Sequence, residues 1–222
     1  MLKKLVPVFK SDGFTVIGYF FCLLMATCVA MDIPKIAALF QELILLILLI
    51  FLLILHKSLI KKKISAKLIC KSILWGLSAI LIELIVISGV MLITKVSLPS
   101  VNTSRIFEII LRNPIFIVYT VLIAPMLEEI VFRYSFFNLT EKVYSKLIKG
   151  KYIKFNSKLS WIVCALVTAI IFAGLHADNV VWEYIVISLF FQWLLLRYKD
   201  LRVSIIAHII FNLVTLLLLT LA

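Results

Sequence analysis

The chain has 222 residues, 64% of them hydrophobic, and a formal net charge of +12. A soluble domain has roughly 45–50% apolar residues, and one water-soluble core could not bury this excess, so the composition excludes an ordinary soluble fold. The basic residues lie between apolar blocks, and there are no Gly-rich phosphate loops. This distribution argues against a nucleic-acid partner and for a lipid bilayer with anionic headgroups.

Apolar segments of about the length that crosses a bilayer as a helix, roughly 20 residues, follow one another along the chain. We predict seven membrane-spanning helices, at 14–31, 36–55, 72–94, 115–139, 160–177, 181–197 and 204–222. The few Gly and Pro residues, six and five, favour continuous helices. The predicted fold class is an all-α, polytopic transmembrane bundle, with residues 1–222 forming a single membrane domain.

The basic residues are divided unevenly between the two sides of this predicted bundle. Of the 23 Lys and Arg residues, 18 lie on the side of the N-terminus, four lie on the other side, and Arg133 lies within a segment. Cytoplasmic connections carry such an excess of positive charge. We therefore predict that the N-terminus is inside and the C-terminus outside.

Two features of the middle of the chain leave alternatives open. Glu83 lies in the third segment with no partner on its own helix, so it either joins a polar cavity or is protonated. In the connection 95–114, Arg105, Glu108 and Arg112 share one helical face. That pattern is consistent with a short amphipathic helix on the outer surface, and equally with a plain connector.

The fourth segment contains three charged residues, although a charge at the bilayer centre costs about 2.5–3.5 kcal/mol on insertion scales. Glu129 and Arg133 are four residues apart with the acid first, which predicts an ion pair on one helix. Glu128 points about 100° away, so a group from another helix must face it, unless both acids serve Arg133 in a packing network. Pro125 frees a backbone carbonyl one turn earlier and predicts a kink.

Two later segments carry polar residues at helical spacing. Phe172 and His176 are four residues apart, and Gly174 between them would permit close approach of another helix. His208 and Asn212 are also four apart and share one face. Taken singly, such residues can be interfacial or can hydrogen-bond to a neighbouring helix as simple structural glue.

A carboxylate, two imidazoles and a carboxamide can together hydrolyse a bond. A glutamate or a histidine can remove a proton from water, and a histidine and an asparagine can donate hydrogen bonds to an oxyanion. We therefore expect Glu128, His176, His208 and Asn212 to line one polar cavity. Straight helices would place them at different depths, so the fifth segment must tilt or begin outside the membrane, or the connection 198–203 must lie deep.

These spacings resemble the EExxxR, FxxxH and HxxxN motifs of the CAAX proteases and bacteriocin-processing enzymes, the Rce1-like or Abi family. The matching residues are Glu128-Glu129-x-x-x-Arg133, Phe172-x-x-x-His176 and His208-x-x-x-Asn212. The resemblance covers about residues 115–215, which would be the catalytic core. It implies that Glu128 with His176 activates water and that His208 with Asn212 forms an oxyanion hole. Glu129 and Arg133 would hold the site together.

The resemblance leaves the use of a metal open, because this family has also been described as metalloproteases. Glu128, His176 and His208 could bind zinc, but the HExxH signature is absent. We expect a mechanism that needs no cofactor.

The resemblance implies an intramembrane endopeptidase, multi-pass in a cell membrane, with a peptide or membrane-protein substrate. A sequence rich in Lys, Ile, Leu and Phe suggests a bacterial plasma membrane, and the family resemblance suggests roles such as bacteriocin self-immunity or peptide processing. One alternative is a non-catalytic membrane scaffold or regulator of an envelope or sensor protein. Another is a small proton-coupled transporter, although the sequence has no inverted repeat.

Overall fold

The computed structural model describes residues 5–32, 34–60, 63–95, 100–149 and 157–221, and these residues contain helices and no strand. The helices that precede the motifs are α1 (Leu5–Asp32), α2 (Pro34–Leu55), α3 (Lys57–Ile60), α4 (Ala66–Thr94) and α5 (Val101–Arg112). A continuous rod follows, made of α6 (Phe116–Val118), η2 (Tyr119–Ile123), α7 (Ala124–Glu128), η3 (Glu129–Phe136) and α8 (Phe137–Lys149). The remaining helices are α9 (Ser157–Leu175), α10 (Val181–Tyr198) and α11 (Leu201–Leu221).

The predicted all-α class is confirmed, since every predicted segment is helical in the described part of the chain. The helices do not coincide with the predicted segments at every end: the fourth segment continues as helix to Lys149, and the helix of the fifth ends at Leu175, just before His176. By length and composition, three described helices can cross a membrane, at Ser11–Cys28, Ala66–Thr94 and Leu201–Leu221. The exact number of spans and the orientation stay predictions.

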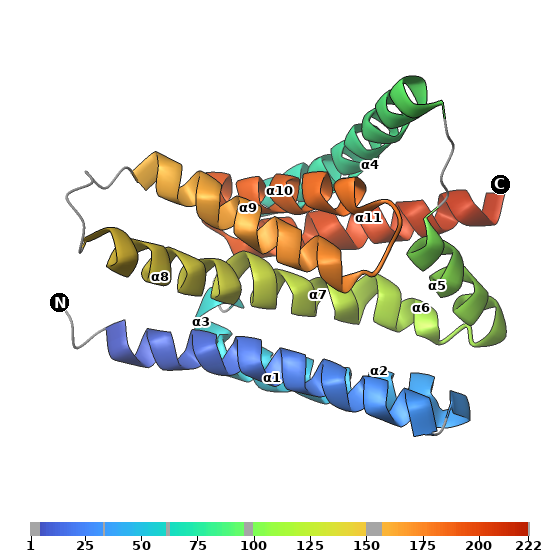
Figure 1. Cartoon of the computed structure of the whole chain (residues 1–222), viewed down its shortest axis with the longest axis horizontal. Helices are drawn as coiled ribbons and strands as arrows, with labels where there is room; N and C mark the ends of the chain where they lie inside the picture. Colours follow the sequence, from blue (N-terminus) through green and yellow to red (C-terminus); the bar gives the residue numbers. More distant parts are fainter. Residues whose placement is uncertain (1–4, 33, 61–62, 96–99, 150–156, 222) are drawn as a thin grey trace.

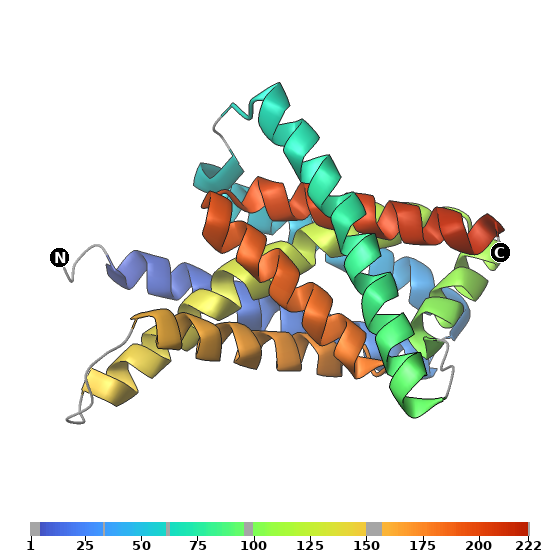
Figure 2. The same cartoon turned by 90° about the horizontal axis from the view of Figure 1, so that it is seen from above.

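The helices lie in layers along the long axis of the molecule (Figure 1). The hairpin of α1 and α2 forms one side, the rod from α6 to α8 runs through the middle, and α9, α10 and α11 cover the other face of the rod. α4 lies outermost, packs mainly against α11, and crosses it obliquely (Figure 2). The two termini lie at opposite ends.

Among the glycines that the structure describes, the closest approach to a neighbouring helix is that of Gly76, which joins α4 to α11 and which we did not single out. A Cβ added there would lie 2.6 Å from the carbonyl oxygen of Ala207 and 2.7 Å from the Cβ of Ile210. Our prediction of a close approach at Gly174 was wrong, since a Cβ there would meet no atom within 4 Å. Gly174 is exposed, because it lies on the outer face of α9.

The connection between α4 and the rod contains the helix α5, so the alternative of a plain connector is excluded. The side-chain oxygen of Ser100 caps the helix by accepting a hydrogen bond from the backbone N–H of Thr103, at 3.0 Å, which is the usual role of serine at this position. α5 lies at the end of the bundle near the C-terminus (Figure 1).

Candidate active site

The charged motif residues of the rod, Glu128, Glu129 and Arg133, make the predicted ion pair and two contacts with α11. Nε of Arg133 lies 3.5 Å from Oε1 of Glu129, and both side chains are fully buried. Glu128 faces the other way, and its Oε2 lies 3.7 Å from Nε2 of His208. The partner that Glu128 required from another helix is therefore His208.

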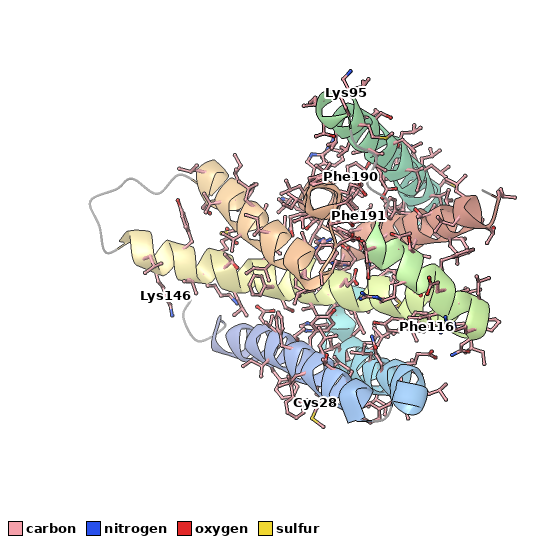
Figure 3. The ribbon with its side chains drawn as sticks, turned by 45° about the vertical axis from the view of Figure 1, so that its right-hand side comes forward. Cys28, Lys95, Phe116, Lys146, Phe190 and Phe191 are labelled. Atoms are coloured by element: carbon pink, nitrogen blue, oxygen red, sulfur yellow. The ribbon has the colours of Figure 1, made fainter. Side chains whose placement is uncertain are left out.

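His208 is held from two directions. Its Nδ1 lies 2.9 Å from Oε1 of Glu129, and because an ionised carboxylate only accepts hydrogen bonds, Nδ1 is the donor. Its ring stacks on Phe191 of α10 at a centroid distance of 4.5 Å, and Figure 3 labels Phe191 on that helix. Glu129 thus contacts both the arginine of its own helix and the ring of His208.

Pro125 and Asn212 are connected through a wide turn of the rod that the sequence did not predict. η2 is a π-helical turn, in which the N–H of Ala124 donates to the carbonyl of Tyr119, five residues earlier. In that register the next donor would be residue 125, a proline without an N–H, so the carbonyl of Thr120 is left free. Nδ2 of Asn212 donates to that carbonyl at 3.0 Å. A carboxamide nitrogen carries two hydrogens, so the second stays available.

His176 lies just beyond the last residue of α9. Its Nδ1 is 2.9 Å from the carbonyl oxygen of Phe172, which can only accept, so Nδ1 is the donor and Nε2 of the neutral ring is an acceptor. The ring lies between Phe172, at 4.5 Å between centroids, and Tyr184 of α10, at 4.2 Å with the planes 29° apart.

The antiparallel packing of α9 against η3 explains how His176 reaches the same depth in the bundle as the two glutamates. Cζ of Arg133 lies 4.2 Å above the ring of Phe172, and Phe172 also contacts Phe132 at 5.3 Å between centroids. One turn further along α9 is His176, and one turn back along the rod are the two glutamates. α9 is inclined to the rod in Figure 1, and its C-terminal end lies against it.

All four predicted side chains, those of Glu128, His176, His208 and Asn212, line one cavity of about 430 Å³. Glu83 lines it as well, as the first of the two alternatives for this residue predicted. No hydrogen bond or ion pair joins His176 directly to Glu128 in the described part of the chain. The cavity wall also includes aromatic and polar side chains from α1, α2, α5 and α10, among them Tyr19, Gln41, Asn102 and Tyr184.

Asp178, which sequence reasoning missed, fastens α5 over this cavity. Its carboxylate accepts hydrogen bonds from the hydroxyls of Ser100 (2.5 Å) and Tyr184 (2.8 Å) and from the backbone N–H of Val101 (3.0 Å). Burial raises the pKa of Asp178, but these hydrogen bonds outweigh burial and hold the pKa below its usual value. The sequence signal was an aspartate two residues after the motif histidine, but its partners in the Ser100–Val101 segment are more than 70 residues away.

The three side chains that would form a zinc site are Glu128, His176 and His208. No group of three or more His, Cys, Asp or Glu side chains within the described ranges is arranged to hold a metal ion. Nδ1 of each of these two histidines donates to a protein oxygen, so Nε2 is the ring nitrogen left for a metal or a proton. The steps proposed below are written without a metal.

The stretch that carries these motifs is similar to known proteins. Residues 110–214 match the family model described as "Type II CAAX prenyl endopeptidase Rce1-like". The chain is similar to the "Putative membrane peptidase YdiL" of Bacillus subtilis, with 29% identity over 146 residues, which cover 64% of this chain and 54% of that protein. It is also similar to the "Membrane-embedded CAAX protease MroQ" of Staphylococcus aureus, with 32% identity over 114 residues, which cover 51% of this chain and 42% of that protein.

The chain thus spans about half the length of the curated relatives that it matches. No solved structure matches it significantly. The family match covers the rod from its first residues, α9, α10 and most of α11, which together carry all three motifs. Through residues 110–214, the chain is similar to the Rce1-like CAAX proteases, and it is a membrane protein.

Proposed function

We propose that this protein is an intramembrane endopeptidase that hydrolyses a peptide bond presented in the cavity. The observation that carries the proposal is that a buried polar series from Arg133 through Glu129 and His208 to Glu128 ends at a cavity. A polar network whose only role was to hold helices together would need partners for its polar groups, but it would need no cavity beside them. The cavity also contains His176, whose Nε2 is free to accept a proton.

In the proposed reaction, a water molecule lies between Glu128 and His176, and these two side chains activate it. One of the two removes a proton as the water oxygen bonds to the peptide carbonyl carbon. The carbonyl π electrons move to the oxygen, which becomes an oxyanion. The C–N bond then breaks, and the departing nitrogen receives the proton that was taken from water.

His208 and Asn212 would stabilise the oxyanion. A doubly protonated imidazole donates from both nitrogens, so His208, held through Nδ1 by Glu129, would direct its Nε2–H into the cavity. Asn212 would contribute the amide hydrogen that Thr120 does not use. Arg133 would act indirectly, by balancing the charge of Glu129. We further propose a bacterial plasma membrane as the location, and bacteriocin self-immunity or peptide processing as the role.

The decisive variant is Glu128→Gln, which keeps the size of the side chain and removes the base. We expect cleavage to be abolished while the protein accumulates normally, because a buried amide is cheaper than a buried carboxylate. The substrate is found by comparing membrane peptides and small proteins in cells that express either form. Glu42→Gln is the matched control, since Glu42 is a partly buried acid of α2 outside the cavity wall.

A non-catalytic scaffold would give the opposite result. Full biological activity of a normally expressed Glu128→Gln protein would therefore contradict the proposal. The proposed mechanism needs no metal, so purified protein should keep its cleavage rate after treatment with a zinc chelator.

A further inference from the structure

His176 is the one proposed catalytic side chain that lies outside a helix. α9 ends at Leu175, and the backbone turns sharply after His176, since Ala177 has a φ of 47°. The hydrogen bond from Nδ1 to the carbonyl of Phe172 fixes one point of the ring. Because one hydrogen bond still allows the ring plane to tilt, a second contact is needed to direct Nε2.

That second contact comes from another helix, through Tyr184 of α10. The rings of Tyr184 and His176 are stacked, at 4.2 Å between centroids and 29° between planes. Phe172 contacts the imidazole at a steeper angle, 56°, so Tyr184 is the ring that lies nearly parallel to it.

Tyr184 is itself held at its hydroxyl. This oxygen donates to Oδ2 of Asp178 at 2.8 Å and accepts from Nδ2 of Asn102 at 3.2 Å. Asn102 belongs to α5, and Asp178 lies two residues after the histidine. A tyrosine anchored at both its ring and its hydroxyl has little freedom to move.

We propose that Tyr184 is a positioning residue that sets the plane of the His176 imidazole, so that Nε2 faces the cavity. The proposal rests on the function proposed above for His176. Tyr184 acts on the reaction only through the histidine, and its ring, rather than its hydroxyl, makes the contact that sets the plane.

The position of the imidazole can be measured without any substrate. The chain has three histidines, so the NMR spectrum of the ring-labelled, full-length protein in detergent is simple, and His176→Gln assigns the resonances. Stacked aromatic rings shift each other's proton resonances. We expect Tyr184→Leu to remove this shift at His176 and Tyr184→Phe to preserve most of it. Tyr144→Leu is the control, because Tyr144 has no ring contact with a histidine in the described part of the chain.

Kinetics with a substrate identified as above provide the second measurement. Misplacement of a catalytic group by about 1 Å can cost roughly 10²-fold in rate. We expect Tyr184→Leu to lower kcat by about that factor with KM near the wild-type value, and Tyr184→Phe to restore kcat. If Tyr184→Leu does not accumulate, Tyr184→Met, which is flexible and apolar, replaces it.

Unchanged His176 resonances in the leucine or methionine variant would overturn the proposal. So would a phenylalanine variant that is as slow as leucine. If the wild-type protein cleaves nothing, the proposed function fails, but the NMR comparison still decides whether Tyr184 positions the ring.

Discussion

Arg133 shows how a charge is tolerated at the centre of this bundle. Its side chain is fully buried, and none of its guanidinium nitrogens has a hydrogen-bond partner within the described residues. The compensation is the charge of Glu129 at 3.5 Å and the face of the Phe172 ring at 4.2 Å. The arginine therefore acts as a positive charge in a fixed place, rather than as a bidentate hydrogen-bond donor.

Arg133→Ala should lower the stability of the protein as well as its activity. Removing one partner of a buried pair leaves an uncompensated charge on Glu129, which costs about 3–5 kcal/mol. We expect a lower protein level in the membrane and a lower midpoint of thermal unfolding in detergent. Arg112→Ala, at an exposed position, should change stability by less than about 0.5 kcal/mol. Normal accumulation of Arg133→Ala would contradict the assigned role.

Just after the wide turn η2, Pro125 leaves the carbonyl of Thr120 free, and Asn212, a proposed oxyanion donor, donates to that carbonyl. Asn212→Ala should reduce the cleavage rate by about 10²–10³, the usual loss for one such donor. Pro125→Ala should also reduce it, because residue 125 regains an N–H that can compete with Asn212 for the carbonyl of Thr120. If the freed carbonyl orients Asn212, Pro125→Ala should have little further effect in the Asn212→Ala background. Independent, multiplying losses in the double variant would argue against this link.

The hydrogen bonds that join the Asp178 carboxylate to the start of α5 should persist in mild acid. The pKa of Asp178 lies below its ordinary value of 3.8, so its stabilisation is complete above that value and is lost as the pH falls through the lowered pKa. Amide exchange in α5, corrected for the intrinsic pH dependence, should therefore keep constant protection between about pH 8 and 5. At neutral pH, Asp178→Asn should speed exchange in α5, since hydrogen bonds to a charged group contribute about 1.5–3 kcal/mol. Loss of protection already near pH 6 would contradict this prediction.

The meeting of the motifs could be predicted from their spacing, but the details of the elements could not. Glu129 to Arg133 and Phe172 to His176 are both separations of four, so two antiparallel helices that pair Phe172 with Arg133 bring His176 to the glutamates. The π-helical turn η2 was not predictable, because the carbonyl of Thr120 that it leaves free is satisfied by Asn212 of another helix, α11. The hydrogen bond between Ser100 and Asp178 was not predicted, because these residues are far apart in the sequence and meet only in the tertiary fold.

At the scale of the whole molecule, the ends of the helices are divided between two sides of the bundle. The start of α1, the end of α8 and the start of α9 lie at one end, and the end of α11 lies at the other (Figure 1). Reporter fusions within 141–158 should therefore read as cytoplasmic, and fusions at the C-terminus as external. A reporter in 141–158 that reads as external would reverse the orientation derived from the basic residues.

The cavity wall is contributed by two stretches of the chain with different relationships to the family. All three motifs lie within residues 110–214, which match the family, whereas Tyr19 and Gln41 reach the cavity from the α1–α2 hairpin, which lies outside that match. Part of the cavity wall is thus encoded outside the stretch that carries the proposed chemistry. If the proposed function holds, exchanging the hairpin for that of a relative should alter which substrates fit while the motif residues stay in place, so substrate preference could diverge without any change in the motifs.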